Sequence, residues 1–265
     1  MTNHLFSVVI PIIPKHFRYL SKLLFELESE SNLINEILIC ASSVSKSDVN
    51  ILEEIVENSR ISSNVRIVSS SDARTAGENR NMGWDEARGE FIAFLDADDT
   101  YHSSRLTLIS KIINDSNIDA LVHDYYRLAP RRVLVRRPNP LFNLVDQTKL
   151  RSANKGRLES EFPSDDIYSG QTNLKLPNEF EHVSRIHHGH LIVRRSIPIR
   201  YSPRKLGEDG ELVVEILKNG YNLSFIDAKL SIYDRLNFSN IRQSFLGHTK
   251  VISSRIYRFL RGVKK

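Results

Sequence analysis

Apolar residues in the first part of the chain follow two different spacings. Residues 5–13 form a short run rich in β-branched side chains that ends at Pro14, which predicts a strand buried on both faces. A helical spacing follows, in Phe17, Leu20, Leu23, Leu24 and Leu27. Residues 34–40 then repeat the apolar run. This order indicates a βαβ unit, the building block of a parallel sheet.

The same alternation continues downstream. We expect helices at 49–58, 77–88 and 105–114, and strands at 65–68, 91–95 and 120–126. Gly89 is the expected stop of the second of these helices, and Ser103 with Ser104 the expected cap of the third. Regular alternation of strands and helices predicts an α/β fold with a doubly wound sheet.

The second half of the chain is less regular. Residues 127–178 are rich in Arg, Pro, Asn, Ser and Asp and have weak periodicity, which is typical of a long functional loop. Beyond them we expect a strand at 191–193, a helix at 208–219 ended by Gly220, strands at 223–226 and 230–233, and a basic helical tail at 241–260.

Composition narrows the class of protein. The 265 residues are 40% hydrophobic and 26% charged, which is typical of a globular chain with an ample core. Cys40 is the single cysteine, so intramolecular disulfides and multi-cysteine zinc sites are excluded. No apolar run reaches the roughly 20 residues of a transmembrane helix, and the first residues lack the features of a signal peptide. We therefore expect a cytoplasmic protein.

Positive charge is concentrated at the carboxyl end. The formal net charge is +5, but residues 235–265 hold eight Lys or Arg and no acidic residue, which leaves a net charge of −3 on the remainder. This distribution argues against a nucleic-acid-binding domain. The basic, amphipathic stretch 241–265 fits peripheral contact with an anionic membrane surface, or equally packing on its own domain or on a second subunit of a homo-oligomer.

The sharpest chemical feature is the acidic sequence Asp96-Ala97-Asp98-Asp99, which comes directly after a predicted central strand. In an α/β sheet the carboxyl ends of the strands are where ligands bind. Asp96 and Asp98 point the same way from an extended backbone, and a divalent ion such as Mg²⁺ or Mn²⁺ is commonly held by one or two carboxylates together with substrate phosphates. The alternative interpretation is a solvated turn that caps the next helix.

Several motifs in a fixed order give this feature a context. They are residues 7–11, 77–84 and 87–99, followed by Gly207-Glu208-Asp209, Gly220-Tyr221 and residues 230–233. This set resembles the family 2 glycosyltransferases, inverting enzymes of the GT-A fold, over about residues 5–126 and 186–236. The resemblance implies a Rossmann-like nucleotide-sugar-binding mixed sheet flanked by helices.

The resemblance also implies a division of the chain. Residues 1–126 are the expected nucleotide-sugar-binding half, and residues 127–185 an irregular insertion that forms an acceptor loop region. Residues 186–236 are the expected acceptor-binding half with the catalytic base, and residues 237–265 a basic carboxyl-terminal helix.

On the donor side, the resemblance assigns Pro11 to the nucleotide pocket, Arg80 to the donor and Asp96 to the ribose or sugar. Asp98, with Asp99, is the expected ligand of Mn²⁺ or Mg²⁺. Asp72 is a candidate contact for the base, although a loop carboxylate among serines is more often simply solvated. Arg80 could equally be an ion-pair partner on a helix surface.

On the acceptor side, the resemblance implies that Asp209, beside Glu208, is the general base. At a helix amino terminus the peptide dipoles favour an ionised carboxylate. The alternative is that both residues only complete the first helical turn. His188 and His190 are candidates for an acceptor contact or a third metal ligand, against the alternative of a solvent-facing loop.

The sequence departs from the family pattern at two places. Most relatives end the second strand with paired aspartates, one of which reads the nucleotide, whereas here Ile39 is followed by Cys40-Ala41-Ser42-Ser43. The nucleotide is therefore left open. The family's Tyr-Arg-x-His stretch appears only as residues 233–236, Tyr-Asp-Arg-Leu, so the third metal ligand is also unassigned.

The predicted function is metal-dependent, inverting transfer of a sugar from a nucleoside diphosphate donor to a glycan or lipid-linked acceptor, in surface polysaccharide synthesis. One alternative is a non-catalytic binding or scaffold module of the same fold. A nucleotidyltransferase is a weaker alternative, because residues 11–14 do not supply the glycine-rich phosphate loop that it would need.

Overall fold

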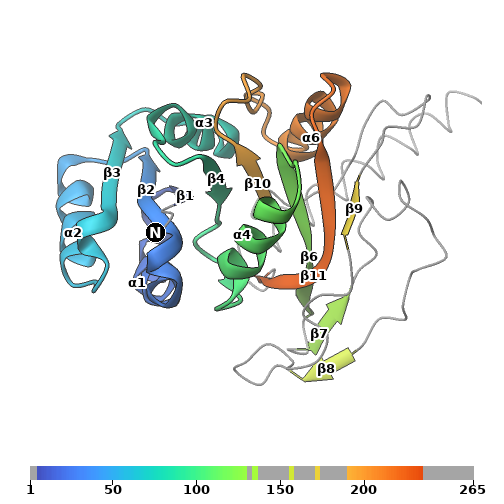
Figure 1. The fold of residues 1–265 in the computed structure, drawn as a ribbon. Coiled ribbons are helices and arrows are strands. Elements are labelled where there is room, and N and C mark those ends of the chain that lie inside the picture. Colours follow the sequence, from blue (N-terminus) through green and yellow to red (C-terminus); the bar gives the residue numbers. More distant parts are fainter. Residues whose placement is uncertain (1–4, 130–132, 137–154, 158–170, 174–189, 235–265) are drawn as a thin grey trace, which may run out of the picture.

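The computed structural model describes residues 5–129, 133–136, 155–157, 171–173 and 190–234 (Figure 1). The described strands are β1 (Phe6–Ile12), β2 (Ile34–Ser42), β3 (Val65–Ser70), β4 (Phe91–Phe94), β5 (Thr100–Tyr101), β6 (Ala120–Ala129), β7 (Val133–Arg136), β8 (Lys155–Arg157), β9 (Gln171–Asn173), β10 (Leu191–Arg194) and β11 (Leu223–Asp234). The described helices are α1 (Phe17–Leu27), α2 (Lys46–Glu57), α3 (Ala76–Glu86), α4 (Arg105–Asp115) and α6 (Glu208–Lys218), with 3₁₀ turns at 14–16, 28–33 and 62–64.

One mixed sheet runs through both halves of the chain. Its order is β3-β2-β1-β4-β10-β6-β11-β5, with β7 and β8 continuing from β6, and β9 paired with β11. The first four strands are parallel, and β10 is antiparallel to both of its neighbours, β4 and β6. The predicted mixed α/β sheet is confirmed, and the strand pair β4–β10 joins the two predicted halves in a single layer.

Helices cover both faces of this sheet (Figure 1). The apolar side chains of α1, α2 and α4 pack in one hydrophobic cluster with the sheet, and those of α3 and α6 belong to a second cluster on the opposite face. The spacing that predicted α1 places Phe17, Leu20, Leu23, Leu24 and Leu27 in the first cluster. Sheet positions that alternate in the sequence therefore point to two separate cores.

Two local predictions about helix ends are wrong. Neither Ser103 nor Ser104 caps α4 through its side chain; instead Glu30, from the 28–33 turn, accepts hydrogen bonds from the backbone N–H groups of Leu106 (2.9 Å) and Thr107 (2.7 Å). A helix end needs acceptors for its first N–H groups, and a distant buried carboxylate provides them here.

Gly89 is not the stop of α3, which ends at Glu86. Glycine is required at position 89 for a different reason, since a Cβ there would lie 2.6 Å from the backbone nitrogen of Ser7. The turn before β4 therefore lies directly against the start of β1.

The carboxyl-terminal strands also differ from the prediction. The two expected strands at 223–226 and 230–233 form one long strand, β11, with register shifts around Lys229. The short strand β5, which follows the acidic sequence directly, pairs with β11 through Tyr101 and Ser231. This pairing, which was not predicted, brings the end of β11 to the acidic sequence. The predicted tail at 241–260 lies outside the described residues.

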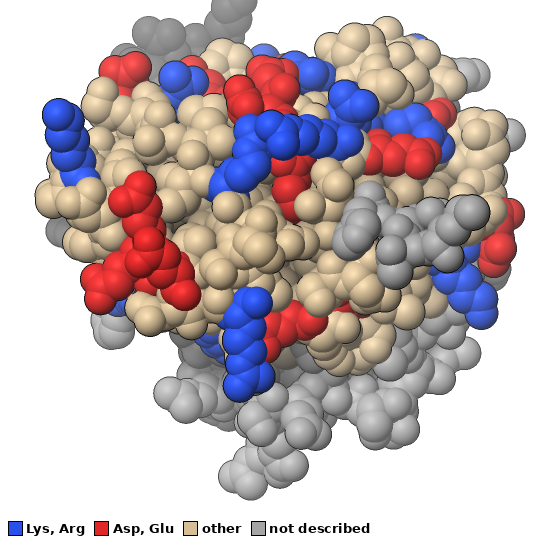
Figure 2. Space-filling model, turned by 60° about the vertical axis from the view of Figure 1, so that its left-hand side comes forward, with Lys and Arg blue, Asp and Glu red and all other residues tan. Residues whose placement is uncertain are grey.

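The face toward the β3 edge carries acidic and basic side chains in small groups of both signs (Figure 2). No patch of a single sign covers this view. Within the described residues, no helix is both long enough and apolar enough to cross a membrane.

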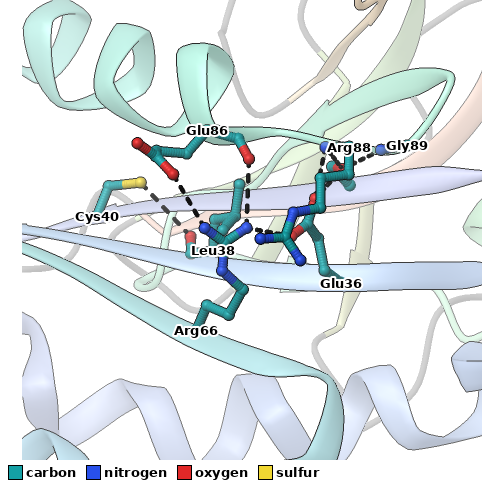
Figure 3. Close-up of polar contacts among 8 residues, drawn as sticks. Glu36, Leu38, Cys40, Arg66, Glu86, Arg88 and Gly89 are labelled. Carbon is teal, nitrogen blue, oxygen red and sulfur yellow. Dashed lines mark hydrogen bonds and ion pairs between the residues drawn. The ribbon is translucent and has the colours of Figure 1, made fainter.

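Glu36 is a buried carboxylate near the starts of the parallel strands, at the edge of the sheet opposite the acidic sequence (Figure 3). It accepts hydrogen bonds from the Ser7 hydroxyl (2.9 Å) and the Arg88 backbone N–H (2.6 Å), and it pairs with Arg66 (2.6 Å). Arg66 also pairs with Glu86 at the end of α3 (2.9 Å). These bonds join β1, β2 and β3 to the turn before β4, so they align the strand that leads to Asp96.

Candidate functional site

A cavity of about 300 Å³ opens at the carboxyl ends of β1 and β4, between these strands and the start of α3. Its lining comprises Pro11, Ile12, Ile13, Lys15, His16, Arg74, Ala76, Asn79, Arg80, Asp96, Ala97, Asp98 and Tyr233. The position agrees with the expectation for α/β sheets, and the volume lies at the lower end of ligand pockets, roughly 300–1,000 Å³. Four predicted residues, Pro11, Arg80, Asp96 and Asp98, meet here.

The acidic sequence is held in a tight turn. The Asp96 backbone N–H donates to the Tyr101 hydroxyl (2.7 Å), and the Asp99 N–H donates to the Asp96 carbonyl (3.2 Å). Burial, with the nearby charges of Asp99 and Asp96, raises the pKa of Tyr101 well above its usual value, so the phenol keeps its proton. Asp98 lines the cavity, whereas the Asp99 side chain is buried outside its lining.

Arg80 is the central residue of the site. Its side chain is only 1% exposed, and its Nη2 donates to Asp96 Oδ1 at 3.0 Å. Its Nη1 lies 3.6 Å from Glu208 Oε1 and 3.9 Å from Asp209 Oδ1. Burial opposes the charge of the guanidinium, but Asp96 and Asp209 outweigh that effect, and the pKa of Arg80 is raised. One buried cation therefore joins the carboxylates of both predicted halves.

Glu208 and Asp209 begin α6, directly after Gly207, which has a left-handed backbone (φ 86°) that favours glycine. Glu208 is buried and the Asp209 side chain is 16% exposed. Neither lines the cavity; their connection to it runs through Arg80.

The segment before α6 is fixed against α3. The Asn81 side chain donates to the Tyr201 carbonyl (2.8 Å) and accepts from the Tyr201 backbone N–H (2.9 Å). At Gly77, a Cβ would lie 2.9 Å from the Ser202 carbonyl oxygen, so the helix can approach this closely only with glycine. The buried ring of Tyr201 packs beneath the Arg80 guanidinium at 5.4 Å. These contacts hold Asp209 near Asp96.

The predicted histidines have different positions. His188 lies outside the described residues. His190 is buried beside His123 (5.0 Å between ring centroids) and Tyr125 (4.2 Å) and does not line the cavity. Within the described residues, no group of three or more His, Cys, Asp or Glu side chains could hold a metal ion. The predicted role of His190 as a ligand therefore stays a prediction.

His123 has a defined tautomer. Arg105 Nε donates to His123 Nε2 (2.9 Å), and because a guanidinium cannot accept, Nε2 carries no proton. The ring proton must lie on Nδ1, which donates to the Asp124 carbonyl (2.8 Å). The imidazole is therefore neutral, which fits a structural support for the neighbouring His190.

Asp72 is exposed and does not line the cavity, so its predicted contact with the base stays a prediction. Its carbonyl accepts a hydrogen bond from Ser43 (3.0 Å), which has a left-handed backbone (φ 56°) that is rare outside glycine. The end of β2, where the family's paired aspartates are missing, is thus held in a defined turn.

The sequence analysis gave no role in the site to several of the lining residues, among them His16, Asn79 and Tyr233. His16 follows Pro14 in the turn after β1, so the rule that ligands bind beyond the strand ends could have found it. Burial, with the charge of Lys15, lowers the pKa of His16 to about 4 despite the opposite effect of Asp96. Tyr233 reaches the cavity through the β5–β11 pairing, which has no local sequence signal.

Comparison with known proteins agrees with this fold. Similar solved structures include S. aureus TarS 1–349 in complex with UDP (18% identity, TM-score 0.61, covering 87% of this chain and 60% of that one) and the same protein in complex with UDP-GlcNAc (19%, 0.58, 87% and 58%). A mycobacterial protein is also similar (14%, 0.53, 86% and 66%). These likenesses confirm the GT-A-like fold, and the chain spans about 60% of the length of TarS 1–349.

No curated protein sequence matches the chain. The profile of the family described as Glycosyl transferase family 2 matches residues 7–173, which include the cavity strands, the acidic sequence and Arg80. The match covers more than half of the chain, and so the chain belongs to glycosyl transferase family 2.

Proposed function

We propose that this glycosyltransferase moves a sugar from a nucleoside diphosphate donor to a hydroxyl group of a glycan or lipid-linked acceptor, with inversion at the anomeric carbon. The setting that we propose is surface polysaccharide synthesis at the cytoplasmic side of the membrane. UDP is the proposed nucleotide, because similar structures are complexes with UDP and UDP-GlcNAc.

The observation that carries this proposal is the position of Arg80. It lines the cavity, donates to Asp96 at 3.0 Å, and lies within 4 Å of Glu208 and Asp209. Donor-side and acceptor-side carboxylates are therefore close to one another beside one cavity. This arrangement suits a reaction in which a donor occupies the cavity and a second substrate approaches from α6.

The chemistry of the acidic turn fits a divalent ion. Asp98 lines the cavity and presents hard oxygen atoms, and Mg²⁺ or Mn²⁺ is commonly bound through one or two carboxylates with the remaining ligands from phosphate and water. Asp98 would hold the ion, with the predicted help of Asp99. When bound, the ion would neutralise negative charge on the departing diphosphate.

Asp209 is the proposed general base. In inverting transfer, a carboxylate takes the proton of the attacking hydroxyl on the face of the sugar opposite the leaving group. The amino terminus of α6 and the cation of Arg80 both favour the ionised carboxylate. Glu208, which is also close to Arg80, would position that cation.

The residue assignments on the donor side follow from the lining. Pro11 would bound the nucleotide pocket and Asp96 would contact the ribose or sugar. Arg80 would have two roles. It would contact the donor as a lining residue, and its hydrogen bond would orient Asp96 toward the donor.

A thermal-shift panel tests the proposal. UDP, GDP, CDP and dTDP would each be added with Mn²⁺, Mg²⁺ or EDTA, because a ligand that binds only the folded state raises its apparent stability. We expect the largest shift with UDP, and we expect EDTA and the Asp98→Asn substitution to abolish it. Asp115→Asn, at an exposed carboxylate outside the site, is the matched control.

If no nucleotide shifts the wild-type protein under any condition, the donor assignment is wrong, and a non-catalytic module of this fold becomes the better explanation. A shift that persists in EDTA would overturn the metal assignment alone.

A further inference from the structure

The start of α3 carries an unusual polar residue, Asn79, at its contact with the sheet. One turn later on the same helix face, Gly83 packs against Val9 and Cys40, where a Cβ would lie 2.5 Å from Val9 Cγ1 and 2.6 Å from Cys40 Sγ. Asn79 occupies the equivalent position at the open end of the same two strands. It therefore lies where β1 and β2 end, and it lines the cavity.

The orientation of the Asn79 amide is fixed by its partners. Nδ2 lies 3.3 Å from the Ile12 carbonyl oxygen and 2.8 Å from the Ser42 hydroxyl oxygen. A carbonyl oxygen can only accept, so the nitrogen must face Ile12 and the amide cannot be flipped. Both N–H groups are then used within the protein, and only the amide oxygen remains to bind a ligand.

That oxygen, Oδ1, is buried and has no hydrogen-bond partner among the described residues. A buried acceptor without a partner is unfavourable by about 1–3 kcal/mol and is uncommon in native proteins. Because Asn79 belongs to the lining of the proposed donor cavity, a ligand that supplies a donor group would relieve this deficit.

We propose that Asn79 determines the specificity for the nucleobase, with Oδ1 accepting a hydrogen bond from the ring N3–H of uracil. This inference rests on the proposed function. Ser42, which stands at the strand end where relatives have aspartates, does not read the base itself but orients the amide. The base is thus read by a neutral acceptor rather than by a carboxylate.

The chemistry of the pyrimidine ring makes the proposal specific. Uracil carries a proton on N3, whereas cytosine has a lone pair there, so cytosine would face Oδ1 with a second acceptor. An acceptor that is left unpaired, or that faces a second acceptor, weakens binding about tenfold or more for each lost hydrogen bond. UDP should therefore bind at least about tenfold more tightly than CDP.

Titration calorimetry of the full chain with Mn²⁺ tests this difference. In Asn79→Ala we expect the UDP-to-CDP affinity ratio to fall close to one. Asp115→Asn, at an exposed carboxylate outside the site, is the control, and it should retain the ratio. If Asn79 only holds the strand ends together, Asn79→Ala should lower stability and leave the ratio unchanged, which would overturn the proposal.

A second measurement needs no substitution. UDP methylated at N3 has no proton to donate, so the wild-type protein should bind it at least about tenfold more weakly than UDP. Asn79→Ala should reduce this penalty, because it removes the acceptor and makes room for the methyl group. Equal affinity of the wild type for both ligands would overturn the role of Asn79 while leaving UDP binding, and thus the proposed function, intact. Absence of any nucleotide binding would overturn both.

Discussion

At the scale of single residues, Arg80 differs most from its expected environment. The sequence was equally compatible with a donor contact and with an ion-pair partner on the helix surface. In the structure the Arg80 side chain is 1% exposed and lies among Asp96, Glu208 and Asp209. A buried cation is tolerated when carboxylates compensate its desolvation, and removing it leaves their charges uncompensated. Its helical position could be predicted, but its partners come from two distant segments of the chain.

His16 gives a pH-dependent prediction at the same scale. Its pKa falls from the usual 6.5 to about 4 in the folded protein, mainly through burial. Between these two values the unfolded chain binds the proton more readily than the folded one, so acidification favours unfolding. We expect the free energy of unfolding to decrease as the pH falls from 6.5 toward 4.

The measurement is urea denaturation at a series of pH values for the wild type and for His16→Gln. Glutamine does not titrate, so the variant should lose less stability over this interval. Parallel stability curves for the two proteins would show that His16 does not contribute to the acid sensitivity.

At the scale of elements, local signals predicted most strands and helices but not their ends. The apolar runs of β1, β2 and β4 and the helical spacing of α1 are buried as expected. The cap of α4 was missed because Glu30 is far from it in the sequence. The strand β5 was missed because two residues carry no periodicity, and its partner β11 lies more than a hundred residues later.

The cap of α4 yields a matched pair of substitutions. Glu30→Ala removes an acceptor for the backbone N–H groups of Leu106 and Thr107 and should lower the free energy of unfolding by about 1–3 kcal/mol. Ser104→Ala removes no side-chain capping bond and should change it by less than about 0.5 kcal/mol. Equal effects in denaturant titrations would mean that the helix end is not stabilised by Glu30.

At the scale of the whole molecule, one sheet carries both halves of the site. β4 leads to Asp96 and Asp98, and its neighbour β10 belongs to the second half of the chain, in which Tyr201, Glu208 and Asp209 follow. The sequence motifs predicted that both sets of carboxylates are functional. Their meeting at Arg80, together with the contributions of Asn79 and Tyr233 to the cavity, depends on long-range packing that no single stretch of sequence encodes.

The most direct test of this account is turnover of a UDP-sugar donor by three proteins: the wild type, Asp209→Asn and the control Asp115→Asn. Release of UDP would be measured with Mn²⁺ and with EDTA, and UDP binding would be measured in parallel. We expect metal-dependent release from the wild type and the control, and normal UDP binding with at least about a hundredfold slower release from Asp209→Asn. Full turnover by Asp209→Asn would contradict the account, because the carboxylate that Arg80 brings to the donor side would then not be the base.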